Sequence, residues 1–184
     1  RLVQAREALR KRDRAKLAAH RDVLVAARHP LAMWADYWEL NNRLSESSQA
    51  ELDAFYARWP GTYVEDRLRN DWLLELGRRR DWRNFATEYP RCKLHDDREV
   101  SCYATLLRHH AGDDVRATAR TSWFAQRDGD DGCNLLVTTL YTARLFGASD
   151  VWLKAREAAE ARRLNAARQA LTLLGEDAGP TLTE

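Results

Sequence analysis

Apolar residues recur through most of the chain at intervals of three or four positions. In the clearest stretch, Val64, Leu68, Trp72 and Leu76 fall at i, i+4, i+8 and i+12, which places them on one face of a helix. No stretch alternates β-branched or aromatic residues with polar ones, and the sequence contains no isoleucine. Since such alternation marks a half-buried strand, the pattern predicts an all-α protein.

Capping signals divide this pattern into separate helices. Ser48 and Glu51 have capping-box spacing, and Thr62 and Glu65 repeat it ahead of a helix that Gly77 is placed to end or bend. The other predicted elements are a helix with Pro30 in its first turn that runs through Leu40, one capped by Asp81 and closed by Pro90, one opened by Asp96 and Glu99, and helices over residues 114–126, 134–146, 149–163 and 165–174.

The predicted helices form repeating pairs. Gly77, Gly112 and Gly147 are 35 residues apart in each case, and Arg12–Leu17 shares a basic–Asp–helix pattern with Arg80–Phe85. Units of about 34 to 40 residues, each with two short helices, are typical of stacked-hairpin solenoids. The sequence therefore predicts a right-handed α-superhelix of stacked helical hairpins, similar to tetratricopeptide (TPR) repeats.

Composition limits the classes of partner. Lys+Arg total 30 against 28 Asp+Glu, a formal net charge of +2, whereas nucleic-acid binders concentrate uncompensated positive charge. No apolar run reaches the roughly 18 to 20 residues of a transmembrane helix. The helical pattern begins at Arg1, so we expect a processed chain whose targeting segment has been removed. We expect one superhelical domain over residues 1–174 and a tail or linker over 175–184.

The stretch QRDGDDGCN, residues 126–134, combines aspartate and glycine as calcium loops do. An EF-hand loop needs glycine at its sixth position and glutamate at its twelfth. Counted from Asp128, those positions hold Cys133 and Thr139. We therefore expect a solvated turn between helices and no metal site.

Other chemistry-bearing residues lack the spacing that their chemistry needs. The sequence has no HExxH, CxxC, GxSxG or glycine-rich phosphate loop, so we expect neither metal nor cofactor. Residues 78–80, all arginine, fit the last turn of a helix without a ligand. Most tryptophans are expected to pack between helices, with one or two exposed on a concave surface that could stack on sugars or bases. The histidines without metal-site spacing are His20, His29, His95, His109 and His110. The tryptophans are at positions 34, 38, 59, 72, 82, 123 and 152.

The cysteines allow a disulfide. Neighbouring antiparallel hairpins could bring Cys102 and Cys133 together, and the bridge would add roughly 3 kcal/mol by closing a loop of about 30 residues. Such a bridge requires an oxidising compartment. The alternative is that all the cysteines, Cys92 included, remain thiols in a cytosolic protein.

Motifs in a fixed order across the chain resemble those of a known family. They are Leu76–Phe85 (LGRRRDWRNF), Glu99–Tyr103 (EVSCY), Ala119–Trp123, Asp131–Leu136 (DGCNLL) and, upstream, Pro30–Tyr37 and Phe55–Thr62. In order and spacing they are similar to the N-terminal superhelical region of soluble lytic murein transglycosylases, over about residues 2–174.

This resemblance implies a role for the parent protein. Family members cleave the MurNAc–GlcNAc bond of peptidoglycan without water, leave a 1,6-anhydro end, and work in the bacterial periplasm. Their α-superhelix precedes a lysozyme-like catalytic domain. The resemblance also implies a disulfide between Cys102 and Cys133, with Cys92 outside the bridge.

One part of the family pattern is absent from this sequence. The family's catalytic glutamate lies in a Glu-Ser motif that a GAxGL-type segment follows, and no such segment occurs here. Glu46-Ser47 is a Glu-Ser pair, but it continues as Ser48-Gln49-Ala50-Glu51 at a helix start. We therefore assign no catalytic residue and expect a non-catalytic superhelical fragment, whose partners are peptidoglycan glycan strands and the missing catalytic domain. The alternatives are a TPR-like module that binds an envelope protein or peptide, and arginine-mediated RNA binding.

Overall fold

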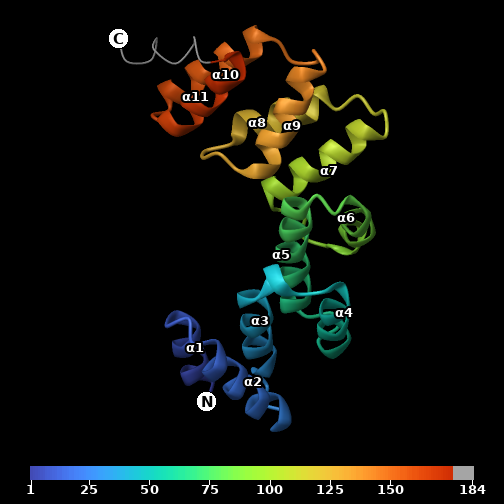
Figure 1. Cartoon of the computed structure of the whole chain (residues 1–184), viewed down its shortest axis with the longest axis vertical. Helices are drawn as coiled ribbons and strands as arrows, with labels where there is room; N and C mark the ends of the chain where they lie inside the picture. Colours follow the sequence, from blue (N-terminus) through green and yellow to red (C-terminus); the bar gives the residue numbers. More distant parts are fainter. Residues whose placement is uncertain (176–184) are drawn as a thin grey trace. The chain divides into compact units, whose positions relative to one another are not determined.

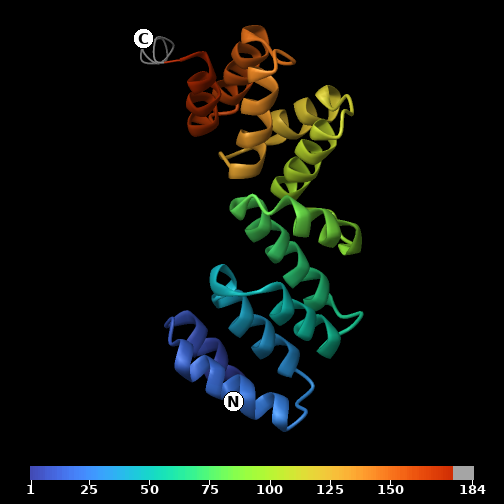
Figure 2. The same cartoon turned by 45° about the vertical axis from the view of Figure 1, so that its right-hand side comes forward.

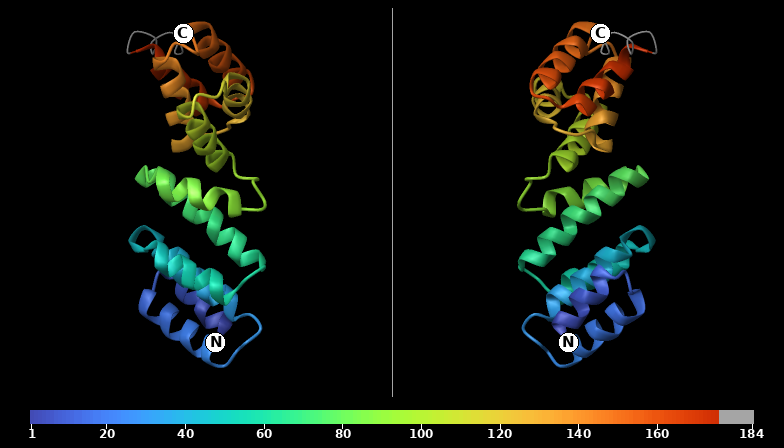
Figure 3. Two further views of the ribbon diagram at one scale, coloured as in Figure 1. Left: turned by 90° about the vertical axis from the view of Figure 1, so that its right-hand side faces the viewer. Right: turned by 90° about the vertical axis from the view of Figure 1, so that its left-hand side faces the viewer.

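The computed structural model describes residues 1–175, and every regular element among them is helical, which confirms the all-α prediction. Figures 1 and 3 show these elements from several sides. The α-helices are α1 (Leu2–Arg10), α2 (Arg14–Ala26), α3 (Ala32–Asn42), α4 (Gln49–Arg58), α5 (Tyr63–Arg79), α6 (Trp82–Glu88), α7 (Arg98–His110), α8 (Arg116–Ala125), α9 (Asp131–Thr142), α10 (Ala148–Glu160) and α11 (Leu164–Leu171), and the short 3-10 helices are η1 (Leu44–Glu46), η2 (Tyr89–Arg91) and η3 (Thr172–Leu174).

The helices belong to two compact units. Unit 1 comprises Arg1–Arg79 and Thr87–Leu94, and unit 2 comprises Arg80–Ala86 and the chain from His95 onward. The predicted tail at 175–184 lies outside the described residues, apart from Gly175.

Unit 1 begins with the antiparallel hairpin of α1 and α2, against which α3 packs (Figure 2). Small side chains let these helices approach: Ala5, Ala32 and Ala35 are fully buried, and Leu17 is 1% exposed. Trp38 packs against this core. The tryptophan therefore serves the inter-helix packing that its spacing predicts.

Unit 2 contains most of α6 together with α7 to α11. Helices α7 and α8 pack on α9, and α10 and α11 pair as a hairpin. Its core contains Trp123 of α8, whose ring stacks on that of Phe146 at 5.7 Å between centroids. Leu136 and Leu140 of α9 are fully buried beside them. A continuous apolar cluster thus joins the hairpins of this unit.

Arginine, more often than glycine, forms the turn that ends a helix. Arg12, Arg28, Arg144 and Arg162 follow α1, α2, α9 and α10 with φ of 56°, 49°, 58° and 59°, in the left-handed region that glycine adopts most easily. After α2, for example, His29 follows the left-handed Arg28 and closes a Schellman turn, because its N–H donates to the carbonyl of Leu24 at 3.0 Å.

The evenly spaced glycines do not mark equivalent turns. Gly112 has φ of 97° and forms the turn after α7. Gly77, in contrast, lies inside α5, and Gly147 precedes α10 as its N-cap. The prediction that Gly77 ends or bends its helix is wrong about the end, because α5 continues to Arg79.

The shared basic–Asp–helix pattern corresponds to a repeated turn. Arg12 and Arg80 both have positive φ, of 56° and 59°. The aspartate that follows each of them caps the next helix, since Asp13 accepts from the N–H of Lys16 at 3.1 Å and Asp81 accepts from the N–H of Asn84 at 3.2 Å. One dipeptide therefore ends one helix and starts another.

Most predicted helix starts are confirmed within a few residues. The N–H of Ser48 donates to Glu51 at 2.9 Å, as a capping box requires, and the N–H of Glu65 donates to Thr62 at 3.3 Å. The predicted start at Asp96 is wrong by one residue, because Asp97 caps α7. Other small shifts are that Pro30 precedes α3 instead of lying in its first turn, and that α9 begins at residue 131 instead of 134.

Candidate functional site

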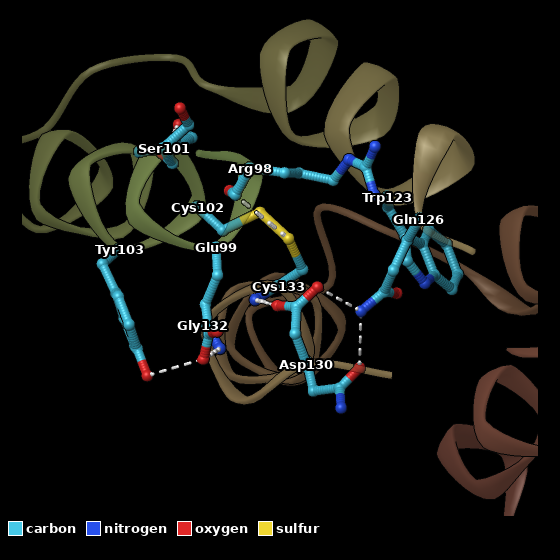
Figure 4. The surroundings of a disulfide bond; sticks show 12 residues. Arg98, Glu99, Ser101, Cys102, Tyr103, Trp123, Gln126, Asp130, Gly132 and Cys133 are labelled. Atoms are coloured by element: carbon cyan, nitrogen blue, oxygen red, sulfur yellow. Dashed lines mark hydrogen bonds between the residues drawn. A yellow bond between two sulfur atoms is a disulfide. The ribbon is translucent and has the colours of Figure 1, made fainter. Parts of the chain in front are cut away.

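The disulfide predicted from the family resemblance joins α7 to α9 in unit 2 (Figure 4). Cys102 and Cys133 are bonded, with their Cα atoms 4.9 Å apart and with both side chains fully buried. The bridge closes a sequence separation of 31 residues. The third cysteine, Cys92, is buried in unit 1.

The acidic turn before α9 positions Cys133 for this disulfide. Asp130 caps α9, its carboxylate accepting from the N–H of Cys133 at 2.7 Å, as Figure 4 shows. Gly132 faces α7 so closely that a Cβ atom there would lie 2.6 Å from the carbonyl oxygen of Glu99. Only glycine therefore allows α9 to approach α7 without a shift of one of the helices.

Asp131, which follows Asp130, also forms hydrogen bonds within unit 2. Its carboxylate accepts from the guanidinium of Arg80 at 2.9 Å and from the hydroxyl of Tyr103 at 2.5 Å. Burial, and then this hydrogen bond, raise the pKa of Tyr103. Among residues 1–175 no cluster of His, Cys, Asp and Glu side chains is placed to hold a metal ion.

Lys154 of α10 is a buried cation that the sequence pattern did not reveal. It is 2% exposed, and its Nζ donates to the carbonyl oxygens of Trp123 at 2.6 Å, Gln126 at 3.1 Å and Phe124 at 3.4 Å. These carbonyls end α8, where a helix dipole favours positive charge. Burial nevertheless lowers the pKa of this ammonium to about 8.

Unit 1 buries a network of charges between α4, α5 and α6. Glu88 is 1% exposed and accepts from the Nε of Arg69 at 3.2 Å and from the amide of Gln49 at 3.0 Å. The guanidinium of Arg69 lies 4.1 Å from the ring centroid of Tyr56. Gln49 in turn accepts from the indole N–H of Trp72 at 2.8 Å. The network gives the Glu88 carboxylate, the Arg69 guanidinium, the Gln49 amide and the Trp72 indole N–H partners away from water.

A mixed aromatic and polar surface lies on α3 and α5 of unit 1. We call it the α3–α5 surface, and it consists of Trp34, Tyr37 and Asn41 of α3 with Tyr63, Arg67 and Asp71 of α5. The two sets are spaced by three or four residues, so each follows one face of its helix, and the helices are in contact.

The aromatic end of this surface is formed by two rings from different helices. The ring centroids of Trp34 and Tyr63 are 6.1 Å apart with planes inclined by 40°. Tyr63 is 59% exposed, because it is the first residue of α5 and points away from the core-facing Val64. Trp34 is half-buried and also meets Tyr37 edge to face, at 6.2 Å between centroids.

The polar end is organised around Asp71. One of its oxygens accepts from the hydroxyl of Tyr37 at 2.6 Å and from the amide of Asn41 at 2.8 Å. The other oxygen lies 3.9 Å from the Nε of Arg67. Burial and the contact with Asp71 raise the pKa of Tyr37.

The Glu-Ser pair, Glu46 and Ser47, lies at the end of η1. The side chain of Glu46 is 61% exposed and pairs with Arg14 at 2.9 Å, whereas a glycosidic acid needs a shielded carboxyl beside its substrate. Ser47 is 3% exposed, and its hydroxyl donates to the carbonyl of Arg43 at 3.0 Å. Both side chains act locally around η1.

The basic run at the end of α5 also has structural partners. Arg79 donates to the carbonyl oxygens of Ser45 at 2.8 Å and Leu44 at 3.0 Å, so it caps η1. Its guanidinium lies 4.9 Å from the ring centroid of Trp72.

The remaining sequence candidates are dispersed over both units. Trp72 and Trp123 are buried, whereas Trp152 is 47% exposed on α10. The rings of His109 and His110 are 5.7 Å apart and inclined by 50°, and His29 accepts from the N–H of Leu31 at 3.1 Å. No helix within residues 1–175 is long and apolar enough to cross a membrane.

Comparison with known proteins gives a likeness to a solved structure. No family model matches the sequence, and no curated protein matches it. The structure is similar to the X-ray structure of an inactive mutant of the lytic transglycosylase Slt from Pseudomonas aeruginosa, with a TM-score of 0.66 and 26% identity. The likeness covers 95% of this chain and 28% of that one. Nearly the whole chain therefore has a fold like part of a lytic transglycosylase.

Proposed function

We propose that this chain is the non-catalytic superhelical scaffold region of a peptidoglycan lytic transglycosylase. The observation that carries the proposal is the likeness to Slt over 95% of the chain, which spans 28% of the Slt chain. The motif order that resembles the N-terminal region of the family supports the same assignment. In the parent enzyme, this region would form part of a curved wall that holds or guides glycan strands.

The catalytic step belongs elsewhere in this proposal. Cleavage of the MurNAc–GlcNAc bond needs a protonated carboxyl held beside the glycosidic oxygen. Glu46 is exposed and paired with Arg14, and no GAxGL segment follows it. The proposed partner of this chain is therefore a catalytic domain of the lysozyme-like kind.

The proposed location is the bacterial periplasm. The Cys102–Cys133 disulfide supports it, because structural disulfides persist in oxidising compartments. The formal net charge of +2 supports a partner other than nucleic acid.

Two assays on the purified chain test this function. The chain should sediment with insoluble peptidoglycan sacculi, and the bound fraction should fall when soluble glycan strands compete. It should release no anhydromuropeptides, as measured by chromatography and mass spectrometry of the digest. A chain that stays in the supernatant would contradict the scaffold role, and anhydro products would contradict its non-catalytic character.

A protein-binding module of the cell envelope is the second candidate. The observation that favours it is the run of short helical hairpins closed by arginine and glycine turns, an architecture that also serves peptide recognition. Retention of envelope proteins on immobilised chain, together with no binding to sacculi, would support this module over the scaffold.

A further inference from the structure

We propose that the α3–α5 surface is a saccharide subsite, which binds one pyranose ring of a glycan strand on Trp34 and Tyr63. The inference rests on the proposed function and adds to it a location and a mode of contact. It assigns the two aromatic rings to the apolar face of the sugar. It assigns Arg67 and Asp71 to the hydroxyl or acetamido groups at the rim.

The aromatic pair has the chemistry that a sugar face requires. A pyranose presents C–H groups on its faces and hydroxyls around its rim, so it stacks on the electron-rich face of a flat ring. Tyr63 is 59% exposed, and its ring centroid lies 6.1 Å from that of Trp34 with a 40° inclination. Two inclined rings of this kind form a shallow seat for one hexose.

The polar end supplies directed hydrogen bonds along the same helices. Asp71 is fixed by the hydroxyl of Tyr37 at 2.6 Å and the amide of Asn41 at 2.8 Å, so its carboxylate is held in one orientation. Arg67 lies one helical turn from both Tyr63 and Asp71, with its side chain 45% exposed. The carboxylate can accept a hydrogen bond from one sugar hydroxyl, and the guanidinium beside it can donate to the next.

The same surface fits other macromolecules less well. Nucleic acid would need uncompensated positive charge beside the rings, and here the charge of Arg67 is balanced by Asp71. A peptide would need apolar side-chain pockets or an open strand edge, whereas the α3–α5 surface presents rings flanked by hydroxyl, amide and charged groups. Aromatic rings beside hydrogen-bonding groups of balanced charge favour a neutral ligand that is rich in hydroxyl groups.

A binding experiment with the whole chain tests this subsite. The probe is the β-1,4-linked tetramer of N-acetylglucosamine, and its affinity is measured by calorimetry beside sedimentation with sacculi. Tyr63→Ala should weaken tetramer binding about tenfold, the loss expected for removal of one stacking ring. Tyr63→Phe keeps the ring and should bind within about twofold of the original chain.

Trp152→Ala is the matched control, because it removes a tryptophan that is 47% exposed in unit 2. It should bind the tetramer as the original chain does. The indole N–H signal of Trp34, assigned by its disappearance in Trp34→Phe, should shift on addition of tetramer in an NMR titration. That signal reports contact in the original protein, so it does not depend on how well a variant folds.

Each result decides a different statement. A chain that binds sacculi but not the tetramer, or binds the tetramer equally after Tyr63→Ala, retains its scaffold role and loses this subsite. A chain that binds neither sacculi nor tetramer loses both. Equal losses of tetramer affinity in Tyr63→Ala and Trp152→Ala would overturn the subsite. Binding of an envelope protein to the α3–α5 surface, with no shift of the Trp34 signal on addition of tetramer, would overturn it as well.

Discussion

The interiors of the two units are held together by different means. Unit 1 buries the charged side chains of Asp36, Asp66, Arg69 and Glu88, each of them hydrogen-bonded within the unit. Unit 2 buries the disulfide and an apolar cluster, and Lys154 is the charged residue identified as buried within its described part. Both units also have an apolar core, to which unit 1 adds buried, hydrogen-bonded charges and unit 2 adds a covalent bond.

This difference determines which condition weakens each unit. A buried ion pair contributes only while both partners are charged and present, because a charge left alone in the interior is costly. A disulfide acts mainly by restricting the unfolded chain, and it disappears in a reducing medium. The two units should therefore respond to different perturbations, and hydrogen exchange with mass spectrometry can follow each separately.

Breaking the charge network of unit 1 should have the largest effect. Glu88→Ala removes the acceptor at 3.2 Å from the Nε of Arg69, a residue that is 6% exposed, and leaves this guanidinium with Glu65 as its carboxylate partner, at 3.1 Å from Nη1. Removal of one partner from a buried pair costs about 3–5 kcal/mol of unfolding free energy. Urea unfolding should show that loss, and amides of α4 and α5 should exchange faster than those of α7 and α9.

Two further variants control this experiment. Glu88→Gln keeps the size of the side chain and an acceptor for Gln49, so it should lose less stability than Glu88→Ala. Glu7→Ala removes only the exposed pair with Lys11 and should leave the unfolding midpoint where it is. If Glu88→Ala unfolded like Glu7→Ala, the network would contribute nothing and the contrast between the units would disappear.

Removal of the disulfide should have the next largest effect, in unit 2. Reduction, or joint replacement of Cys102 and Cys133 by alanine, opens a loop with a sequence separation of 31. The loop-entropy model gives a loss of about 3 kcal/mol. Exchange should accelerate in α7 and α9 while α4 and α5 keep their protection. Equal acceleration in both sets of helices would contradict the separate fastening of the units.

Lys154→Met should cost unit 2 about 2 kcal/mol, because the carbonyl oxygens at the end of α8 lose a buried donor. Methionine matches the length of lysine and fills the space without a charge. Urea unfolding near pH 7 measures the loss. A Lys154→Met chain as stable as the original would show that these carbonyls find other partners.

The same pair of proteins gives a pH prediction. The folded chain releases the proton of Lys154 at about pH 8, whereas an unfolded lysine keeps it to about pH 10.4. Between these values the unfolded state binds more protons, so the free energy of unfolding contributed by Lys154 rises with pH. The stability difference from Lys154→Met should therefore grow from pH 8 to pH 10. A constant difference would mean that the carbonyl acceptors keep the ammonium charged.

Local rules were sufficient for much of the helical framework. Apolar spacing identified the core-facing residues of α5, and the capping pairs located the starts of α4 and α5, because both signals depend on residues within one or two turns. Periodicity alone left the pairing of Cys102 with Cys133 open. The family resemblance selected it, and the structure contains that bond.

Features that depend on distant residues could not be predicted in this way. Lys154 reads as a surface lysine until α8 supplies carbonyls from about 30 positions earlier. The contact between the rings of Tyr63 and Trp34 requires α3 to pack on α5. The expectation that glycine marks the helix ends failed for a local reason. These turns need a residue in the left-handed region, but the hydrogen bonds that close them come from the backbone. Arginine can therefore occupy the position, at some cost in backbone strain.

These turns are the feature that both units share, and they give the smallest predicted effects. Arg28 in unit 1 and Arg144 in unit 2 have φ of 49° and 58°, which costs an L-residue roughly 1–2 kcal/mol. Glycine removes that strain but loses about 0.5–1 kcal/mol of backbone entropy on folding. Arg28→Gly and Arg144→Gly should each raise the free energy of unfolding by about 0.5 kcal/mol, measured by urea unfolding.

Gly112 provides the reverse test at an equivalent turn. Its φ is 97°, and a Cβ atom added there would meet nothing within 4 Å, so Gly112→Ala should lose about 1 kcal/mol through backbone strain alone. Because Schellman hydrogen bonds close the turns after α2, α7 and α9 alike, the changes in the two units should be similar in size. A gain at Arg144 without one at Arg28 would show that the turns, too, are held differently in the two units.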